Sequence, residues 1–269
     1  MPERLSMTQH LQVTCKGHQA RVTLNRPEVR NAFNAELIQE LTATFATLGQ
    51  DASLRAIVLA AEGKAFCAGA DLNWMKAMAG YCWDENHADA GRLAQMLWTI
   101  YRCPVPVIAR VHGDAYAGGV GLVSVCDIVV ASDNAAFCLS EAKLGLLPAT
   151  IAPYVVRALG EQASRRYFTT AERFTAAEAH RHGLVHELVA PDALDAKVDE
   201  LLAALVANGP MAVRACKRLV QDVAHAAITP ELRDDTARRI ADIRASDEGR
   251  AGVRSFLDKT PAPWLDAGS

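Results

Sequence analysis

The chain has 269 residues, of which 51% are hydrophobic and 22% are charged, and its formal net charge is −3. This length and composition allow a substantial buried core, in one large domain or a domain with an appendage. The small negative charge and the lack of a lysine-rich helix give no basis for a nucleic-acid partner. No apolar segment approaches the length that spans a bilayer, and the N-terminus lacks the apolar stretch of a secretory signal, so we expect a cytoplasmic protein without a membrane partner.

The first predicted elements follow from alternation and from helical periodicity. The segment Leu11–Leu24 alternates around Lys16-Gly17-His18 and predicts a hairpin, whereas Ala35–Leu48 places its apolar residues on one helical face. Further strands are predicted at 56–60, 105–111 and 128–131. Helices are expected to dominate after Ile151, which together with the strand-turn-helix units indicates an α/β fold.

Two small-residue turns follow the strands predicted at 56–60 and 105–111. They are 65–72 (AFCAGADL) and 113–122 (GDAYAGGVGL), and each leads into a helix-like segment. Such turns leave backbone N–H groups unpaired, and two fixed backbone donors suit a carbonyl oxygen that gains negative charge during a reaction. Either turn alone is more typical of an ordinary loop, but the pair predicts the two halves of an oxyanion hole. The small residues that allow a ligand close to the backbone are Ala68, Gly69, Ala70, Gly118 and Gly119.

Several motifs resemble those of the crotonase superfamily, also called the enoyl-CoA hydratase/isomerase family. They are Asn25-Arg26-Pro27 with Asn31-Ala32-Phe33, the turn at 66–72, and Gly118-Gly119 followed by Cys126-Asp127. The resemblance runs nearly end to end. Softer similarity, at 69–76, 137–141 and 145–149, is to the bacterial methylglutaconyl-CoA hydratases of leucine breakdown.

The resemblance implies a spiral of ββα turns in residues 1–175, followed by a helical trimerisation region in residues 176–269. In the second region, Gly183-Leu184-Val185 follows a short helical pattern, as when glycine ends a helix before an apolar strand. Amphipathic helices are predicted at 194–206 and 212–223. We therefore expect a homo-oligomer, a trimer or a dimer of trimers, in which neighbouring subunits complete each active site.

Site residues also follow from the resemblance. The amides of Ala70 and Gly118 would be the oxyanion donors, and Glu141 would be the acid/base carboxylate. Flanking Phe137, Leu139 and 144–147 predict an apolar environment that raises the pKa of Glu141. Weaker candidates for positioning water are Ser140, Tyr116 and Asp114.

The substrate is expected to be an acyl-CoA thioester, which brings coenzyme A with it, so no separate cofactor is implied. Arg30 and the backbone around Ala65–Ala68 would meet the adenine and phosphate end of coenzyme A, and Phe256 and Lys259 of a neighbouring subunit would close over it. The other residues assigned to substrate or coenzyme A contact lie in the matching motifs: Ala32, Ala68, Gly69, Asp71, Leu72, Tyr116, Gly119 and Ser140.

The acyl pocket is less strongly predicted. Trp74, Met75 and Met78 either line it or pack in the core, because Met suits both irregular ligands and irregular cores. A methylglutaconyl group also carries a distal carboxylate, which calls for a cation. Candidates for that cation are Lys76, Arg92 and Arg157.

Cysteine and histidine patterns do not indicate a metal or a disulfide framework. The seven cysteines are odd in number and scattered, as expected for free thiols in a reducing compartment. Gly183 lies between His182 and His186, and no third ligand completes a zinc pattern. The run Gly119-Val120-Gly121 lacks the third small residue of a dinucleotide fingerprint.

One departure from the family pattern bears on the reaction. Many members supply a first glutamate after the double glycine, and alignment on Cys126-Asp127 puts Gly121 at that place. A single glutamate, Glu141, suits an enoyl-CoA hydratase in which one carboxylate both accepts and returns the proton. It equally suits a Δ3,Δ2-enoyl-CoA isomerase, and a non-catalytic acyl-CoA-binding or assembly protein is the third alternative.

Overall fold

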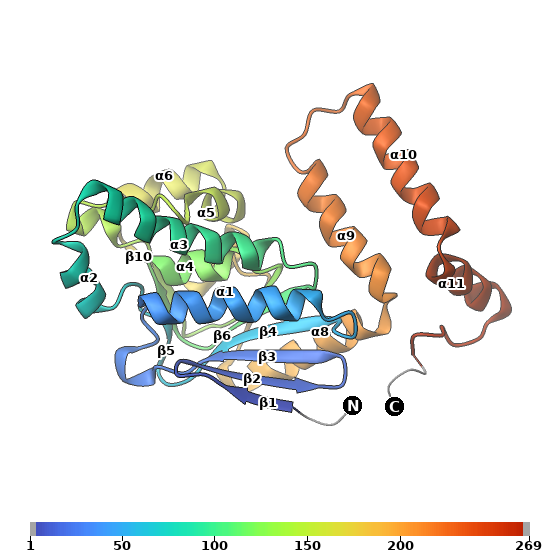
Figure 1. The fold of residues 1–269 in the computed structure, drawn as a ribbon, viewed down its shortest axis with the longest axis horizontal. Coiled ribbons are helices and arrows are strands. Elements are labelled where there is room, and N and C mark those ends of the chain that lie inside the picture. Colours follow the sequence, from blue (N-terminus) through green and yellow to red (C-terminus); the bar gives the residue numbers. More distant parts are fainter. Residues whose placement is uncertain (1–3, 266–269) are drawn as a thin grey trace.

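The computed structural model describes residues 4–265 and contains two β-sheets (Figure 1). In the larger sheet, the first three strands pair antiparallel and the others pair parallel. Its seven strands are, in spatial order, β1 (Arg4–Met7), β2 (Leu11–Lys16), β3 (Gln19–Leu24), β4 (Ala56–Ala61), β6 (Val107–Val111), β8 (Ile128–Ser132) and β11 (Glu187–Val189). The hairpin predicted at Leu11–Leu24 is confirmed, with Gly17 at the turn at a φ of 57°.

Successive side chains of β4 point to opposite faces of the larger sheet. Ile57 and Leu59 join a hydrophobic core that includes buried residues of α1 (Ala35–Gln50), as the helical periodicity predicted. Ala56 and Val58 point the other way and pack with residues of α8 (Leu194–Ala207). A strand buried on both faces is therefore continuously apolar, as the sequence of β4 is.

The smaller sheet carries the turns that the sequence singled out. Its order is β10 (Arg173–Thr175), β9 (Ala136–Cys138), β7 (Asp114–Tyr116) and β5 (Ala65–Cys67), with β9, β7 and β5 mutually parallel. The segments that follow these strands are α2 (Leu72–Met78), α4 (Gly118–Ser124) and the short 3₁₀ helix η2 (Glu141–Leu144). The long helix α3 (Trp83–Tyr101) packs beside α1 (Figure 1).

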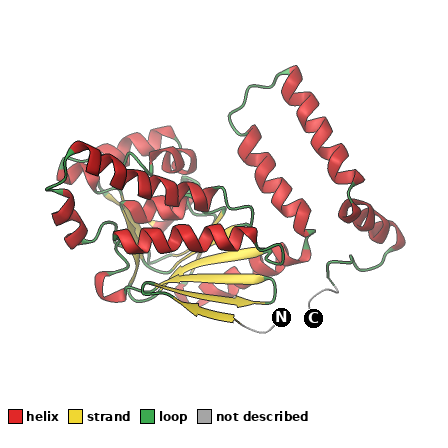
Figure 2. Ribbon diagram, viewed as in Figure 1, coloured by secondary structure: helices red, strands yellow, loops and turns green. Residues whose placement is uncertain are grey.

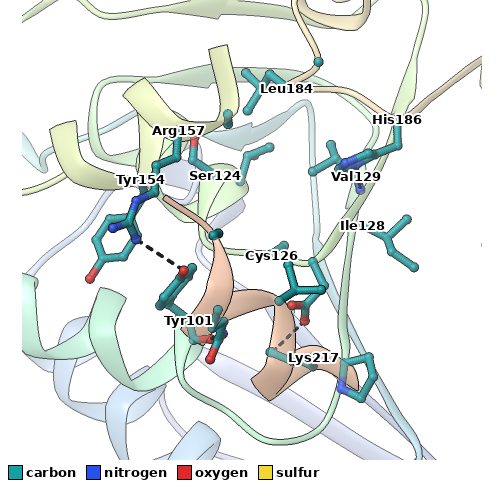
Figure 3. Close-up of a pocket in the computed structure, with 18 of the residues that line it drawn as sticks. Tyr101, Ser124, Cys126, Ile128, Val129, Tyr154, Arg157, Leu184, His186 and Lys217 are labelled. Atoms are coloured by element: carbon teal, nitrogen blue, oxygen red, sulfur yellow. Dashed lines mark hydrogen bonds and ion pairs between the residues drawn. The ribbon is translucent and has the colours of Figure 1, made fainter. Parts of the chain in front are cut away.

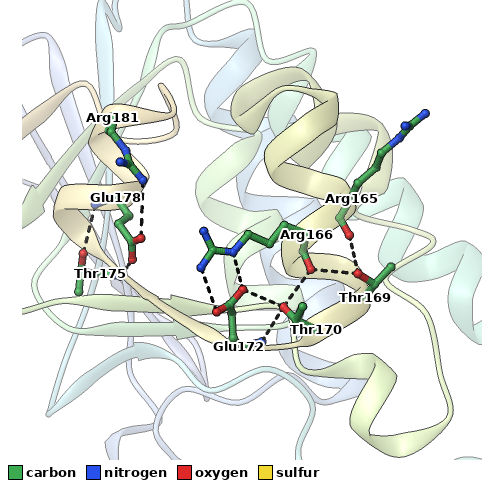
Figure 4. Close-up of polar contacts among 8 residues, drawn as sticks. All are labelled: Arg165, Arg166, Thr169, Thr170, Glu172, Thr175, Glu178 and Arg181. Atoms are coloured by element: carbon green, nitrogen blue, oxygen red, sulfur yellow. Dashed lines mark hydrogen bonds and ion pairs between the residues drawn. The ribbon is translucent and has the colours of Figure 1, made fainter.

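Two sets of polar contacts lie beside the smaller sheet: one joins α6 (Glu161–Thr170) to Glu172, just before β10, and the other is at the start of α7 (Ala176–Arg181) (Figure 4). Arg166 donates to both carboxylate oxygens of Glu172, at 2.6 and 3.1 Å. Thr175 and Glu178 form a capping box at the start of α7. The preceding helix α5 (Ala152–Leu159) packs against both α4 and α6.

The last three helices extend to one side of the sheets, and the first of them contacts the chain just before β8, where Lys217 pairs with Asp127 at 2.6 Å (Figures 1 and 2). They are α9 (Pro210–Val223), α10 (Pro230–Ala245) and α11 (Asp247–Asp258), and none of their residues is buried in the single chain. The remaining short helices are η1 (Pro27–Val29) and η3 (Pro191–Ala193). The domain boundary near Thr175 stays a prediction, but β11 and α8 lie beyond it and pack with the larger sheet.

Candidate active site

The three segments with candidate catalytic groups lie at one edge of the smaller sheet. Strands β5, β7 and β9 are parallel neighbours, so their carboxyl ends meet at the same edge. The Ala117 amide donates to the Cys138 carbonyl at 2.8 Å, which joins the segment after β7 to the end of β9. A Cβ built on Gly69 would lie 3.1 Å from the Ala117 Cβ, so the segments after β5 and β7 also touch.

The Ala70 amide is left available by the bonds on either side of it. The Phe33 amide donates to the Gly69 carbonyl at 2.7 Å, and the Asp71 amide donates to the Phe33 carbonyl at 2.8 Å. No hydrogen bond among residues 4–265 takes the Ala70 amide. Gly69 has a φ of 88°, a conformation that glycine adopts without strain.

The Gly118 amide is available for a different reason. Gly118 is the first residue of α4, so its N–H has no partner within the helix, and within the described part of the chain none comes from elsewhere. Ala117 before it holds a strained φ of 48° and ψ of −118°. A Cβ on Gly119 would lie 2.5 Å from the Cys67 carbonyl oxygen, so α4 can approach β5 this closely only with glycine there.

Glu141 begins η2 at the same edge and is half-buried. Its Oε2 atom is buried without a hydrogen-bond partner among the described residues. Burial raises the pKa of Glu141, as the sequence predicted, and only its own backbone opposes the shift. The expected apolar surroundings are confirmed for buried Phe137 and Leu139 but wrong for the 144–147 segment, where Leu144, Leu146 and Leu147 are exposed.

The comparisons with known proteins agree with this geometry. The family model for enoyl-CoA hydratase/isomerase matches residues 16–267. The chain belongs to the enoyl-CoA hydratase/isomerase family. An enoyl-CoA hydratase structure from Shewanella pealeana is 39% identical with a TM-score of 0.92, covering 95% of this chain and 96% of that one. Pseudomonas aeruginosa AtuE is 35% identical with a TM-score of 0.92, covering 96% of this chain and 100% of that one. Enoyl-CoA hydratase ACTT6 of Alternaria alternata is 36% identical over 243 residues, which are 88% of this chain and 77% of that protein.

The fold expected from the family resemblance is confirmed. Membership of this family implies an acyl-CoA substrate.

Position 121, where the resemblance places the missing first glutamate, lies inside α4 and is buried. A Cβ built on Gly121 would lie only 2.2 Å from Ile151 Cγ2 and 2.7 Å from Ile151 Cβ. The fully packed Ile151 therefore occupies the direction in which any side chain at position 121 would grow.

Some of the residues predicted to contact coenzyme A form backbone hydrogen bonds near the first turn, and others present exposed side chains. The Arg30 carbonyl accepts from the Ala68 amide at 2.9 Å, and the Arg30 side chain is exposed beside that turn. Ala32 is buried and offers its carbonyl to Arg26, whereas Leu72 at the start of α2 is 74% exposed. Phe256 and Lys259 lie at the end of α11, far along the molecule from β5 and α2 (Figure 1).

Of the groups considered for positioning water, Asp114 already has two partners. It pairs with Arg173 at 2.9 Å and accepts from the Ala136 amide at 3.1 Å, and its role in positioning water stays a prediction. Tyr116 and Ser140 are half-buried at the sheet edge, and burial raises the pKa of Tyr116. Both remain candidates.

The predicted acyl-pocket residues lie on α2, beside α3. The Trp74 indole donates to buried Asp89 at 3.3 Å, and Asp89 pairs with Arg92 at 2.5 Å. Lys76 is exposed. Arg157, the third candidate cation, lies elsewhere and donates to the Tyr101 hydroxyl at 3.3 Å.

Arg157 lines a cavity of about 610 Å³, to which the last residues of α4, Val123 and Ser124, also contribute (Figure 3). Residues from α5, β8 and α9 form its walls, including the Asp127–Lys217 ion pair at 2.6 Å. Burial raises the pKa of Asp127, and the charge and hydrogen bond of Lys217 act against that shift. The described residues around Ala70, Gly118 and Glu141 do not line this cavity, so it is not the predicted acyl-CoA site.

Residues 4–265 show neither a membrane span nor a metal centre. None of their helices has both the length and the apolar character needed to cross a bilayer. They contain no cluster of three or more His, Cys, Asp or Glu side chains arranged to hold a metal ion.

Burial raises the pKa of Cys67, at the start of the first turn, to about 12. This thiol is therefore neutral and does not compete with Glu141 as a base.

Glu141→Gln is expected to stabilise the fold at neutral pH. Because burial raises the folded-state pKa, ionisation of Glu141 opposes folding: stability is fully present below the ordinary pKa of 4.5 and falls as pH rises through the folded-state pKa. Thermal melts should give the variant a higher Tm than the wild type at pH 7, with the difference shrinking toward pH 4. A Tm difference that is absent, or equal at both pH values, would contradict the assigned burial of this carboxylate.

Proposed function

We propose that this protein catalyses the reversible hydration of an α,β-unsaturated acyl-CoA, with 3-methylglutaconyl-CoA or a similar branched enoyl-CoA as substrate. The observation that carries the proposal is the unpartnered, half-buried carboxylate of Glu141 at the same sheet edge as the two available amides of Ala70 and Gly118. Coenzyme A enters as part of the substrate, and the chemistry needs no separate cofactor.

The proposed reaction uses one carboxylate twice. Glu141 accepts a proton from water while the oxygen of that water bonds to the β-carbon, and the π electrons move onto the thioester oxygen. The amides of Ala70 and Gly118 hold that oxyanion in the enolate. Glu141 then returns the proton to the α-carbon, so the net change is addition of one water and the carboxylate is regenerated.

A Δ3,Δ2-enoyl-CoA isomerase is the second candidate. The observation in its favour is the contact between Gly121 and Ile151, which leaves Glu141 without a second carboxylate from position 121. An isomerase needs one base to move a proton between two carbons, and the same two amides would hold its dienolate. Hydratase and isomerase therefore share the site and differ in whether water is positioned there.

Enoyl-thioester absorbance separates the candidates directly. Purified protein should remove the conjugated absorbance of 3-methylglutaconyl-CoA faster than that of crotonyl-CoA. Production of conjugation from a 3-enoyl-CoA, with no hydration of the other two esters, would establish the isomerase instead. Binding of all three esters without turnover would establish an acyl-CoA-binding protein. A glutaconyl preference that Arg92→Gln or Lys76→Gln abolishes would locate the cation for the distal carboxylate.

We propose that the protein works as a trimer or a dimer of trimers. Helices α9, α10 and α11 are unburied in the single chain and expose apolar side chains, among them Phe256 at 83% and Leu257 at 71%. Covering such a surface is a general driving force for association. In this arrangement Phe256 and Lys259 reach the coenzyme A site of a neighbour, and light scattering of the eluted protein would test the subunit number.

A further inference from the structure

Arg26 forms a nearly buried ion pair beside the first oxyanion segment. Its Nη2 donates to Asp71 Oδ2 at 2.9 Å, and its Nη1 donates to the Ala32 carbonyl at 2.5 Å. The two charged side chains are only 11% and 8% exposed. One planar guanidinium thus joins the residue that follows Ala70 to the segment around Phe33.

Asp71 is held at several points besides Arg26. Its Oδ1 accepts from the Asn73 amide at 2.8 Å and caps α2, and its own amide donates to the Phe33 carbonyl at 2.8 Å. Burial alone would raise the pKa of Asp71, but the hydrogen bonds from Asn73 and Arg26 outweigh it and lower that pKa. The carboxylate is therefore ionised at neutral pH, and its position is fixed.

Asn31 anchors the other end of this arrangement. It is fully buried, and its Oδ1 accepts from the Arg26 amide at 2.9 Å. Its Nδ2 donates to the carbonyls of Glu62 and Ala65, at 2.8 and 2.9 Å. The segment 26–33 is thus bonded to the chain on both sides of β5 and to both neighbours of Ala70.

We propose that Arg26, through its ion pair with Asp71, is a positioning residue that aims the Ala70 amide at the thioester oxygen. The inference rests on the proposed function, because it assigns the Ala70 amide an oxyanion role. An oxyanion donor acts only when it points at the developing charge, and misplacement by about 1 Å can cost about 100-fold in rate. Ala70 itself has a free amide, so the bonds to Gly69 and Asp71 on either side must supply its orientation.

The test compares Arg26→Gln, Arg26→Lys and Asp71→Asn with the wild type. Arg26→Gln and Asp71→Asn should lower kcat by about 100-fold with little change in KM, because the lost interaction acts mainly in the transition state. Arg26→Lys keeps the positive charge but cannot donate two hydrogen bonds from one planar group. Its kcat should therefore lie between that of the wild type and those of the other two variants. A cinnamoyl-CoA ester bound to each protein in a Glu141→Gln background should show a red-shifted absorbance in the parent and a smaller shift in each variant.

Arg55→Gln is the matched control, since Arg55 is also buried and also donates to two carbonyls, those of Val206 and Trp264, away from the catalytic edge. It should lose stability yet keep the kcat and the absorbance shift. If Arg26→Gln or Asp71→Asn folds and keeps the wild-type kcat and the wild-type absorbance shift of the bound ester, the inference is overturned. If Arg26→Gln does not fold, the same measurements on Asp71→Asn and Arg26→Lys decide the test. A wild-type protein that neither turns over enoyl-CoA esters nor shifts the probe would overturn the proposed function instead.

Discussion

Glu141→Gln is expected to lower turnover of the enoyl-CoA substrate by about 10³-fold or more while leaving the fold and acyl-CoA binding intact. The substitution keeps the size of the side chain but removes the group that, in the proposed mechanism, both accepts and returns the proton. Oε2 of Glu141 has no hydrogen-bond partner in the described structure, so the amide breaks no hydrogen bond at that atom. Steady-state kinetics together with a binding titration of the acyl-CoA measure the two effects separately.

Glu172→Gln is the matched control for this change. Glu172 is a carboxylate held by Arg166 beside β10 (Figure 4), and it contributes nothing to the catalytic edge. Its loss should leave kcat within a few-fold of the wild type, since exposed ion pairs contribute little to stability. Near-normal turnover by Glu141→Gln, or an equal loss in both variants, would remove Glu141 from its assigned role.

Gly121→Ala is expected to destabilise the protein by about 2–3 kcal/mol, a large effect for one methyl group. The added Cβ would lie 2.2 Å from Ile151 Cγ2. Both residues are part of a closely packed interior, in which neighbouring atoms must move to make room for an added methyl group. Because α4 begins at Gly118, a shift of this helix also moves the amide that is proposed to hold the oxyanion, so activity should fall together with stability. Urea denaturation and enoyl-CoA turnover measure the two consequences.

A double-mutant cycle with Ile151→Ala tests whether the contact is the cause. Ile151→Ala alone leaves a cavity and should lower the free energy of unfolding by about 2–5 kcal/mol. The loss in the double mutant should be smaller than the sum of the two single-mutant losses by about 1 kcal/mol or more. Gly91→Ala is the glycine control, because nothing lies within 4 Å of its built Cβ on exposed α3, and it should be neutral or slightly stabilising. Additive losses from Gly121 and Ile151 would show that the two sites are energetically independent.

The same contact bears on the reaction. Gly121→Glu alone would not supply a second carboxylate, since the longer side chain meets Ile151 at its first carbon. In the proposed mechanism, the use of a single glutamate therefore depends on two positions that lie 30 residues apart in the sequence, 121 and 151.

Local patterns predicted much of what the structure contains. The hairpin at Leu11–Leu24, the helix from Ala35 and the strand from Ile128 follow from periodicities of two and about 3.6 residues, which each segment carries within itself. The two turns were found because glycine-rich turns are also a local signal, whereas Glu141 was singled out by the family resemblance. The family resemblance then assigned these residues to one site.

Long-range contacts decided the rest. Asn25-Arg26-Pro27 was recognised as a motif, but nothing near Arg26 in the sequence indicates Asp71 as its partner, and no signal in the segment around Ile151 shows that it fills the space beside Gly121. The expectation that the apolar segment 144–147 surrounds Glu141 was also wrong, because Leu144, Leu146 and Leu147 are exposed. The physical reason is common to these cases: a sequence pattern specifies which face of an element is apolar, whereas the order of the strands and the packing of helices upon them decide which residue lies opposite.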